Sequence, residues 1–202
     1  MADALRRCPW CGTDELYVRY HDEEWGVPTH DDRRHFEFLV LESAQAGLSW
    51  ITILRKREGY RKAYRDFDPA KVARFAAQDV ERLMGNAGIV RNRAKIEASI
   101  SNARLFLALQ RERGSFDAYL WGWTGGRPVV NRRKALADIP ARTELSDAVA
   151  KDLKARGFRF LGSTIMYSHL QAVGVVDDHI ASCFRARRSG ALRPSTTPWR
   201  GV

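Results

Sequence analysis

Apolar residues recur at helical spacing along most of this 202-residue chain, and the pattern predicts an all-α fold. The stretch over 33–46 places Phe36, Leu39 and Val40 on one face, and the stretch over 91–111 carries a longer apolar face. The other predicted helices begin at Trp50, cover 70–76, 79–84, 162–173 and 178–185, or follow the N-caps Ser115 and Ser146, the last ending at Gly157.

Two segments lack this periodicity. Residues 123–142 are punctuated by two adjacent glycines and a proline, which predicts irregular structure. Residues 187–202 are rich in Arg, Ser, Thr and Pro, which predicts a disordered basic tail. The chain shows no internal repeat, and no two neighbouring segments have the alternating apolar and polar residues of a β-hairpin. We therefore expect one helical domain over residues 1–186, followed by the tail.

The composition is that of a globular protein with a core, because 45% of the residues are hydrophobic and 29% are charged. These fractions exclude disordered and fibrous chains. No apolar run reaches the length of a membrane span, and the first residues lack the apolar centre of a signal peptide. Three cysteines are too few for a disulfide framework. We expect a cytoplasmic monomer that does not bind membranes.

The net charge of +10 is unevenly distributed. Residues 1–50 carry 5 basic and 10 acidic side chains, whereas residues 51–100 carry 12 and 6. Residues 101–150 carry 8 and 5, and residues 151–202 carry 9 and 3. A basic surface attracts polyanions, so we expect a nucleic acid partner for the last three quarters of the chain. The alternative is a basic protein with no such partner.

Cysteine and histidine at both ends of the chain indicate a metal site. His179 and Cys183 lie four residues apart in a predicted helix and would therefore face one way. Thiolate and imidazole are preferred zinc ligands, and Cys8, Cys11 and His21 could supply the remaining two. We expect a closed, structural Zn²⁺ site that joins the N- and C-terminal segments. Ordinary buried cysteines and a capping histidine are the alternative.

The turn over 86–90 has the outline of a helix-hairpin-helix motif, which would cover about residues 79–110. The backbone N–H groups of Gly88 and Val90 at the start of a long helix could hold a phosphate. Three basic side chains follow the turn: Arg91, Arg93 and Lys95. An ordinary corner between two helices is an equally good interpretation from this motif alone.

Aromatic and acidic residues gather in the segment over 17–50. Glu42 lies on the apolar side of its predicted helix, where a carboxylate needs a specific partner. Four aromatic residues accompany it: Tyr17, Tyr20, Trp25 and Trp50. Rings and a buried acid together suit a flat cationic ligand with exocyclic N–H groups. Core packing is the alternative for each single aromatic residue.

Two sequence blocks resemble a known family. Residues 20–28 (YHDEEWGVP) and 42–50 (ESAQAGLSW) are similar to the signatures of the DNA-3-methyladenine glycosylase I family, in the helix-hairpin-helix glycosylase superfamily. The resemblance extends over about residues 8 to 184, through Arg57 and the segments 67–69, 86–91, 156–158 and 178–179.

The resemblance implies roles for single residues. The implied zinc ligands are Cys8, His21, His179 and Cys183, which leaves Cys11 as an additional thiol. In the implied base pocket Glu42 hydrogen-bonds the flipped base with Tyr20, and the stacking rings are Trp50, Tyr17 and Trp25. The implied DNA contacts are Leu48 as an apolar wedge, the amides of Gly88 and Val90, and the side chains of Arg91, Arg93 and Lys95.

The implied activity is monofunctional hydrolysis of the N-glycosidic bond of 3-methyladenine in double-stranded DNA, with free 3-methyladenine as product. Methylation at N3 makes the base cationic, so favouring the expelled base can supply much of the catalysis. No lysine of the matched blocks is expected to act as a nucleophile, and Asp178 is expected to cap a helix or support a zinc histidine. A non-catalytic zinc-stapled DNA-binding module and a zinc hydrolase are the alternatives.

Overall fold

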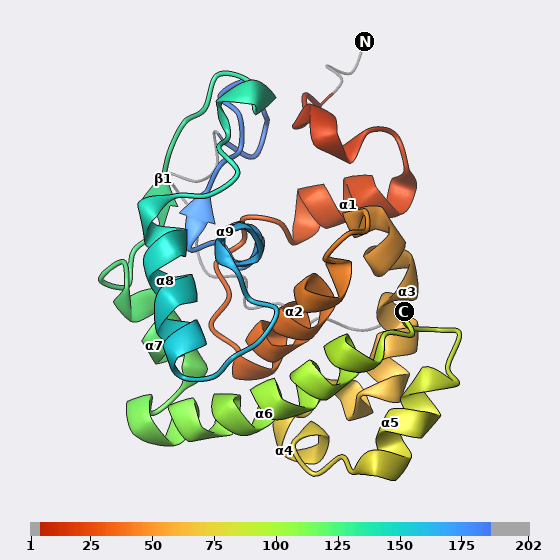
Figure 1. Ribbon diagram of the computed structural model, residues 1–202. Helices are drawn as coiled ribbons and strands as arrows, with labels where there is room; N and C mark the ends of the chain where they lie inside the picture. Colours follow the sequence, from red (N-terminus) through yellow and green to blue (C-terminus); the bar gives the residue numbers. More distant parts are fainter. Residues whose placement is uncertain (1–4, 187–202) are drawn as a thin grey trace.

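Helices form most of the computed structural model, which describes residues 5–186 (Figure 1). The α-helices are α1 (Glu15–Glu23), α2 (Asp32–Gln45), α3 (Trp50–Ala63), α4 (Pro69–Val72), α5 (Ala77–Met84), α6 (Arg93–Arg113), α7 (Phe116–Gly122), α8 (Glu144–Ala155) and α9 (Ser163–Ala172). Short 3₁₀ helices are η1 (Pro9–Cys11), η2 (Arg65–Phe67) and η3 (Leu136–Asp138). The mostly helical fold predicted from periodicity is confirmed. Among the described helices, none is both long and apolar enough to cross a membrane.

Helix α2 lies in the centre of the molecule and packs against α3, α6, α7 and α9 (Figure 1). Every residue of α2 from His35 to Ala44 is buried. A helix that is covered on all sides carries its polar side chains into the core along with its apolar ones. The central position of α2 therefore explains why His35, Glu37 and Glu42 are buried.

Two strands were not predicted. β1 (Val129–Val130) pairs in parallel with β2 (Val176–Asp177), and Val129 lies opposite Val176. Each strand has two residues, which is too short for any alternation of side chains to be visible in the sequence. Strand β1 lies within the segment over 123–142 that we expected to be irregular.

One helix was not predicted, and two others have different bounds from those expected. Helix α1 is absent from the prediction, although Asp14 caps it by accepting hydrogen bonds from the N–H groups of Leu16 and Tyr17. Helix α8 begins after Thr143 rather than Ser146, because these two side chains form a reciprocal capping box. The turn after Phe67 continues into α4, which ends at Val72 instead of extending to residue 76.

The helix predicted over 178–185 is wrong, because this segment forms turns. Its N–H groups are bonded elsewhere: Ala181 donates to the carbonyl of Arg133, and Phe184 donates to that of Arg6. The second of these bonds places the C-terminal segment beside the N-terminal one. The predicted tail over 187–202 lies outside the described residues.

Candidate active site

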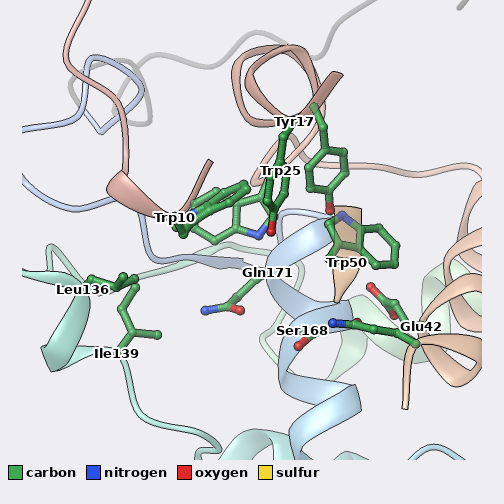
Figure 2. A pocket seen from close by; sticks show the side chains of 11 residues that line it. Trp10, Tyr17, Trp25, Glu42, Trp50, Leu136, Ile139, Ser168 and Gln171 are labelled. Atoms are coloured by element: carbon green, nitrogen blue, oxygen red, sulfur yellow. The ribbon is translucent and has the colours of Figure 1, made fainter. Parts of the chain in front are cut away.

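A cavity of about 220 Å³ opens between α1, α2, α3 and α9 (Figure 2). Its lining consists of aromatic rings, one carboxyl group, small polar side chains and two aliphatic residues: Trp10, Tyr17, Tyr20, Trp25, Glu42, Gln45, Trp50, Leu136, Ile139, Ser168 and Gln171. All five residues expected to bind the base, from Tyr17 to Trp50, therefore line one cavity. A mostly apolar cavity with few polar groups is the usual form of a small-molecule site.

Aromatic contacts fix the walls of this cavity. The rings of Trp10 and Trp25 lie 5.0 Å apart, and Trp10 lies equally close to Tyr17. On the other side, the rings of Tyr20 and Trp50 are 5.6 Å apart. Tilted and edge-on rings at these separations are favourable pairs that hold one another in position. The rings therefore present a rigid aromatic surface to a flat ligand.

Glu42 is the acidic group of the cavity and is buried, with 1% of its surface exposed. Its Oε2 lies 2.9 Å from Nδ1 of His169, which is also buried. Burial raises the pKa of Glu42 well above its usual value and lowers the pKa of His169 to about 3. The two directions agree, because both favour the uncharged forms. Burial therefore favours a carboxyl group bonded to a neutral imidazole.

Several pocket residues were missed by sequence reasoning. Trp10 lies between Cys8 and Cys11, in a segment whose spacing of thiols indicates metal binding. Ser168 and Gln171 line the cavity from α9, and His169 between them contacts Glu42. Three polar side chains within one turn of a mostly buried helix are a signal for such a site. Gln45 lies within the block over 42–50. Leu136 and Ile139 come from the irregular segment and carry no pattern of their own.

The environment of Asp178 differs from the prediction. Asp178 is buried and accepts hydrogen bonds from the side-chain amides of Gln171, at 2.7 Å, and Asn131, at 2.8 Å. Neither expected role, a helix cap or a partner of the zinc histidine, is correct. The carboxylate that contacts His179 belongs to the neighbouring Asp177. Asp178 instead orients the Gln171 amide at the wall of the cavity.

The turn over 86–90 does not offer its amides to a phosphate. The N–H of Gly88 donates to Oδ1 of Asn86 at 2.8 Å, and the N–H of Val90 donates to the Tyr60 hydroxyl at 3.1 Å. Gly88 also packs against Gly59, where an added Cβ would lie 2.3 Å from the Gly88 carbonyl oxygen. Both amides are therefore engaged within the protein, one inside the turn and one with α3, and their predicted phosphate contacts stay a prediction.

The basic side chains after this turn have different environments. Lys95 donates from Nζ to the carbonyls of Ala44 and Ala46 and so caps the C-terminal end of α2. Arg93 pairs with Glu81 on the surface. Arg91 is exposed. Lys95 is therefore already engaged in the structure, whereas the predicted DNA contacts of Arg91 and Arg93 stay predictions.

Leu48 lies in the connection between α2 and α3 and is 42% exposed. Gly47 precedes it with a φ of +81°, a conformation that glycine adopts without strain. The turn therefore presents a large apolar side chain to solvent between the helices that carry Glu42 and Trp50. Its expected role as a wedge stays a prediction.

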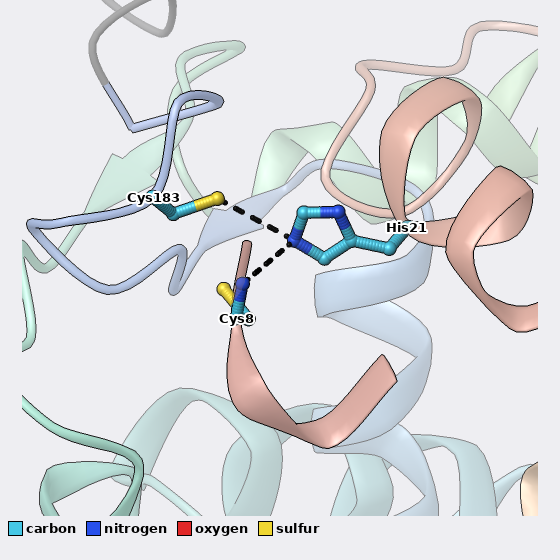
Figure 3. Close-up of side chains that lie close together, drawn as sticks. All are labelled: Cys8, His21 and Cys183. Atoms are coloured by element: carbon cyan, nitrogen blue, oxygen red, sulfur yellow. Dashed lines mark hydrogen bonds between the residues drawn. The ribbon is translucent and has the colours of Figure 1, made fainter. Parts of the chain in front are cut away.

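Three buried residues from the two ends of the chain converge in Figure 3. The ligand atoms of Cys8, His21 and Cys183 all lie within 4.8 Å of one another. Nε2 of His21 lies 3.4 Å from the Cys183 sulfur, while its Nδ1 lies 2.8 Å from Asp22. Cys11 is not part of this group, and its thiol donates to the Cys8 carbonyl. The geometry thus separates Cys11 from the other two cysteines.

His179 borders this group. Its ring centroid lies 5.2 Å from that of His21, and its Nδ1 lies 2.9 Å from Asp177. Its Nε2 is buried without a hydrogen-bond partner among the described residues. Gly26 makes room for the ring, since an added Cβ would lie 2.6 Å from its Cε1. A carboxylate on one nitrogen and an unused second nitrogen are the arrangement of a metal-binding histidine.

The neighbouring thiols of Cys8 and Cys183 shift each other's pKa in opposite directions. The contact with Cys8 lowers the pKa of Cys183 to about 4, and the same contact, together with burial, raises the pKa of Cys8. A lowered thiol pKa favours the thiolate form that metal binding requires. Two cysteines and two carboxylate-supported histidines are a suitable donor set for zinc.

Comparison with known proteins gives consistent matches. The sequence profile of the family described as methyladenine glycosylase matches residues 10–186. The DNA-3-methyladenine glycosylase 1 of Escherichia coli (strain K12) is 49% identical over 179 residues, which cover 89% of this chain and 96% of the relative. The DNA-3-methyladenine glycosylase of Haemophilus influenzae is 46% identical over 177 residues, covering 88% of this chain and 96% of the relative.

Solved structures agree with these relatives. A crystal structure of 3-methyladenine DNA glycosylase I aligns with a TM-score of 0.86 at 51% identity and covers 89% of this chain and 98% of the other. A structure on 3-methyladenine recognition by the Staphylococcus aureus glycosylase aligns with a TM-score of 0.86 at 40% identity, covering 90% of this chain and 96% of the other.

Proposed function

The chain belongs to the methyladenine glycosylase family, and we propose that it removes 3-methyladenine from DNA by hydrolysing the N-glycosidic bond of a nucleotide flipped into the aromatic cavity. The relatives in Escherichia coli and Haemophilus influenzae are named as glycosylases of this base, and two solved structures of relatives concern its binding. The protein is thus an enzyme of base-excision repair.

The observation that carries the proposal is the buried Glu42 carboxyl group in an aromatic cavity. A methylated adenine in DNA is flat and positively charged, and it presents an exocyclic amino group. Aromatic faces attract such a cation, and a carboxylate accepts the N–H bonds. An uncharged purine gains much less from the same surroundings. The cavity therefore selects the cationic base.

The reaction needs little further chemistry from the protein. Water adds to the sugar carbon, the bond from that carbon to the base nitrogen breaks, and its electron pair neutralises the cationic base. The proton of the attacking water is released. Because the base departs uncharged, an enzyme that holds the expelled base in place stabilises the departure itself. Glu42 would hold the base with Tyr20, and Trp50 would stack on it.

Reaching the cavity requires the nucleotide to leave the duplex, which costs a few kcal/mol of unstacking. An apolar side chain inserted into the vacated position offsets part of this cost. We assign this role to Leu48, because it is exposed and lies between the helices that carry Glu42 and Trp50.

The turn between α8 and α9 is a better candidate for the phosphate-binding hairpin than the turn over 86–90. Gly162 is the N-cap of α9, and no side chain of the described residues caps this helix. The first-turn N–H groups are therefore open to solvent or a ligand. Three exposed basic residues line the groove beside the turn: Lys151, Lys154 and Arg159. We therefore place the helix-hairpin-helix at α8–α9.

We also propose that Cys8, His21, His179 and Cys183 hold a structural Zn²⁺. The support is the convergence of three ligands, the unpartnered Nε2 of His179 and the carboxylates behind both histidines. Four protein ligands leave no position for a reactive water, so the ion would link the two ends of the chain without taking part in hydrolysis.

Release of free 3-methyladenine from a methylated duplex tests the proposed function. The purified protein should liberate this base and leave an abasic strand that is still intact, as a monofunctional enzyme does. Release of no methylated purine by the folded protein would contradict the assignment. A strand broken at the abasic position would contradict the monofunctional mechanism alone.

A further inference from the structure

A line of ionisable side chains runs from the cavity to the surface. Glu42 Oε2 lies 2.9 Å from Nδ1 of His169, and the His169 ring neighbours that of His35, with centroids 5.9 Å apart. Nε2 of His35 lies 3.1 Å from the Asp117 carboxylate. Asp117 in turn lies 3.1 Å from Nδ1 of His30, whose side chain is 53% exposed. The line thus begins at the base pocket and ends in solvent.

The two histidines are neighbours, and each has one nitrogen that its carboxyl partner does not use. In each ring one nitrogen contacts a carboxyl group, and the other, Nε2 of His169 or Nδ1 of His35, is buried without a partner among the described residues. Phe116 packs against both rings, at 5.7 and 6.4 Å. With ring centroids 5.9 Å apart, transfer between these nitrogens requires a bridging water or a small rotation of one ring.

Two imidazoles at this place in the core lower the stability of the fold. A buried polar atom without a partner costs free energy, and two apolar side chains would fill the same space without that cost. The surroundings are otherwise apolar, since Phe36, Phe106 and Leu170 are fully buried nearby on α2, α6 and α9. The histidine pair therefore calls for an explanation other than packing.

We propose that His169, His35, Asp117 and His30 form a proton relay, through which Glu42 loses its proton to solvent while the cationic base occupies the cavity. The proposal rests on the proposed contact of Glu42 with the base. An entering base covers the opening of the cavity, so the direct route from Glu42 to water closes at the moment when a carboxylate is needed. The relay provides a second route for this proton, which reaches solvent at Asp117 and His30 instead of through the opening of the cavity.

The transfer conserves every atom and charge. Initially Glu42 is a carboxyl group and each imidazole carries its proton on Nε2. The Glu42 proton moves to Nδ1 of His169, the Nε2 proton of His169 moves to Nδ1 of His35, and the Nε2 proton of His35 moves to Asp117. Asp117 releases one proton to water, directly or through His30. Glu42 ends as a carboxylate, both imidazoles remain neutral, and departure of the uncharged base allows the reverse transfer.

Other ionisable groups face this line. Tyr20 from α1 lines the same cavity as Glu42. Asp32 lies near His35 and accepts hydrogen bonds from the N–H groups of Phe116 and Asp117, at 2.9 and 2.8 Å. Asp32 thereby fixes the start of α7 and holds the Asp117 carboxylate against His35. Burial lowers the pKa of His35, in agreement with a neutral resting imidazole.

The test is single-turnover release of 3-methyladenine from methylated duplex DNA, measured in H₂O and D₂O. His35→Leu removes both nitrogens of one ring, keeps the core filled and leaves the Glu42–His169 contact in place. Its release rate should fall about tenfold, less than the roughly hundredfold or more that a direct acid–base group contributes. Its D₂O rate should fall further, because proton exit becomes limiting. Asp117→Asn should show the same changes without altering either ring.

Phe116→Leu is the matched control, because Phe116 contacts both rings and carries no proton. It should keep the wild-type rate within about twofold and the wild-type ratio of rates in the two solvents, and DNA affinity should be the same in all three variants. Folded His35→Leu and Asp117→Asn proteins with wild-type rates and isotope ratios would overturn the relay, and so would a Phe116→Leu protein that reproduces their defect. If Glu42→Gln is impaired and these variants are not, the relay fails while the proposed pocket stands.

Discussion

Glu42 and His169 are 127 positions apart in the sequence, yet the carboxyl group of one lies 2.9 Å from the ring of the other, inside the wall of an aromatic cavity. Glu42 is thereby held in one orientation, with its second oxygen directed away from this bond. Glu42 is the acidic group of a pocket that is lined by aromatic rings, small polar side chains and two aliphatic residues. Its charge state decides whether the pocket attracts a cation.

Replacement of Glu42 by glutamine tests that role. The amide has the same shape but cannot become an anion, so it loses the attraction to a cationic base and presents an N–H where an acceptor is needed. Release of 3-methyladenine under single-turnover conditions should fall by about a hundredfold or more, while affinity for duplex DNA should not change. Glu58→Gln, at an exposed position of α3, is the control and should behave as wild type. Undiminished release by Glu42→Gln would remove this residue from the mechanism.

His169 predicts a pH dependence of stability. Its pKa in the folded protein is about 3, below the 6.5 of an unperturbed histidine, because of burial. The unfolded chain therefore binds more protons at this site between pH 3 and 6.5, and the contribution of His169 to stability rises with pH over that window. Glu42, with a raised pKa, contributes in the opposite direction, stabilising at low pH and losing this contribution as pH rises above about 4.5.

The measurement is urea unfolding of wild type and His169→Phe at pH 4, 5 and 6.5. Phenylalanine fills the space and cannot titrate. The free energy of unfolding of the variant, relative to that of wild type, should therefore increase as the pH falls, by at most about 1.4 kcal/mol per pH unit. Phe116→Leu changes the same core without a titratable group, and its difference from wild type should not depend on pH. A constant difference for His169→Phe would show that His169 is not buried in its neutral form.

Periodicity and single unusual residues predicted much of this site. The buried carboxylate on α2 was visible because an acid interrupted an apolar face, and the aromatic residues near it were visible by composition. The partners of these residues were not visible. His169 reaches Glu42 only because α9 packs against α2, and nothing in the local sequence of either helix records that packing.

Tertiary hydrogen bonds explain why the helix predicted over 178–185 is wrong. The segment has helical spacing, but the loops at Arg6 and Arg133 supply the acceptors for its N–H groups. The turn over 86–90 has the outline of a phosphate site, but Tyr60 and Asn86 accept its amide protons in this structure. Acceptors such as Arg133 and Tyr60 are distant in the sequence, so no local pattern records them.

The metal proposal includes Cys8 and Cys183 among the zinc ligands and excludes Cys11. Purified protein should contain one zinc ion per chain, and Cys183→Ser and His179→Ala should each reduce the zinc content and the melting temperature. Cys11→Ser is the matched control, because its thiol bonds to a backbone carbonyl outside the ligand group. It should keep the metal. Loss of zinc from Cys11→Ser with retention in His21→Ala would exchange these two residues in the ligand set, and metal-free wild type would remove the site.

The hairpin between α8 and α9 predicts a salt-dependent contribution to DNA binding. Lys154→Gln and Arg159→Gln each remove an exposed charge from the groove beside the open N-terminus of α9. Each should weaken binding to unmodified and methylated duplexes alike and reduce the slope of log affinity against log salt by about 1. The release rate from bound DNA should change little, since neither residue lines the base cavity.

The comparison that decides between the two turns uses Arg91→Gln, beside the turn over 86–90 whose amides are already bonded. If the α8–α9 turn holds the phosphates, Lys154→Gln and Arg159→Gln lower the affinity more than Arg91→Gln does. A larger loss for Arg91→Gln, with unchanged salt slopes for the other two, would return the DNA contact to the turn over 86–90. It would also mean that this turn gives up its bonds to Asn86 and Tyr60 when DNA binds.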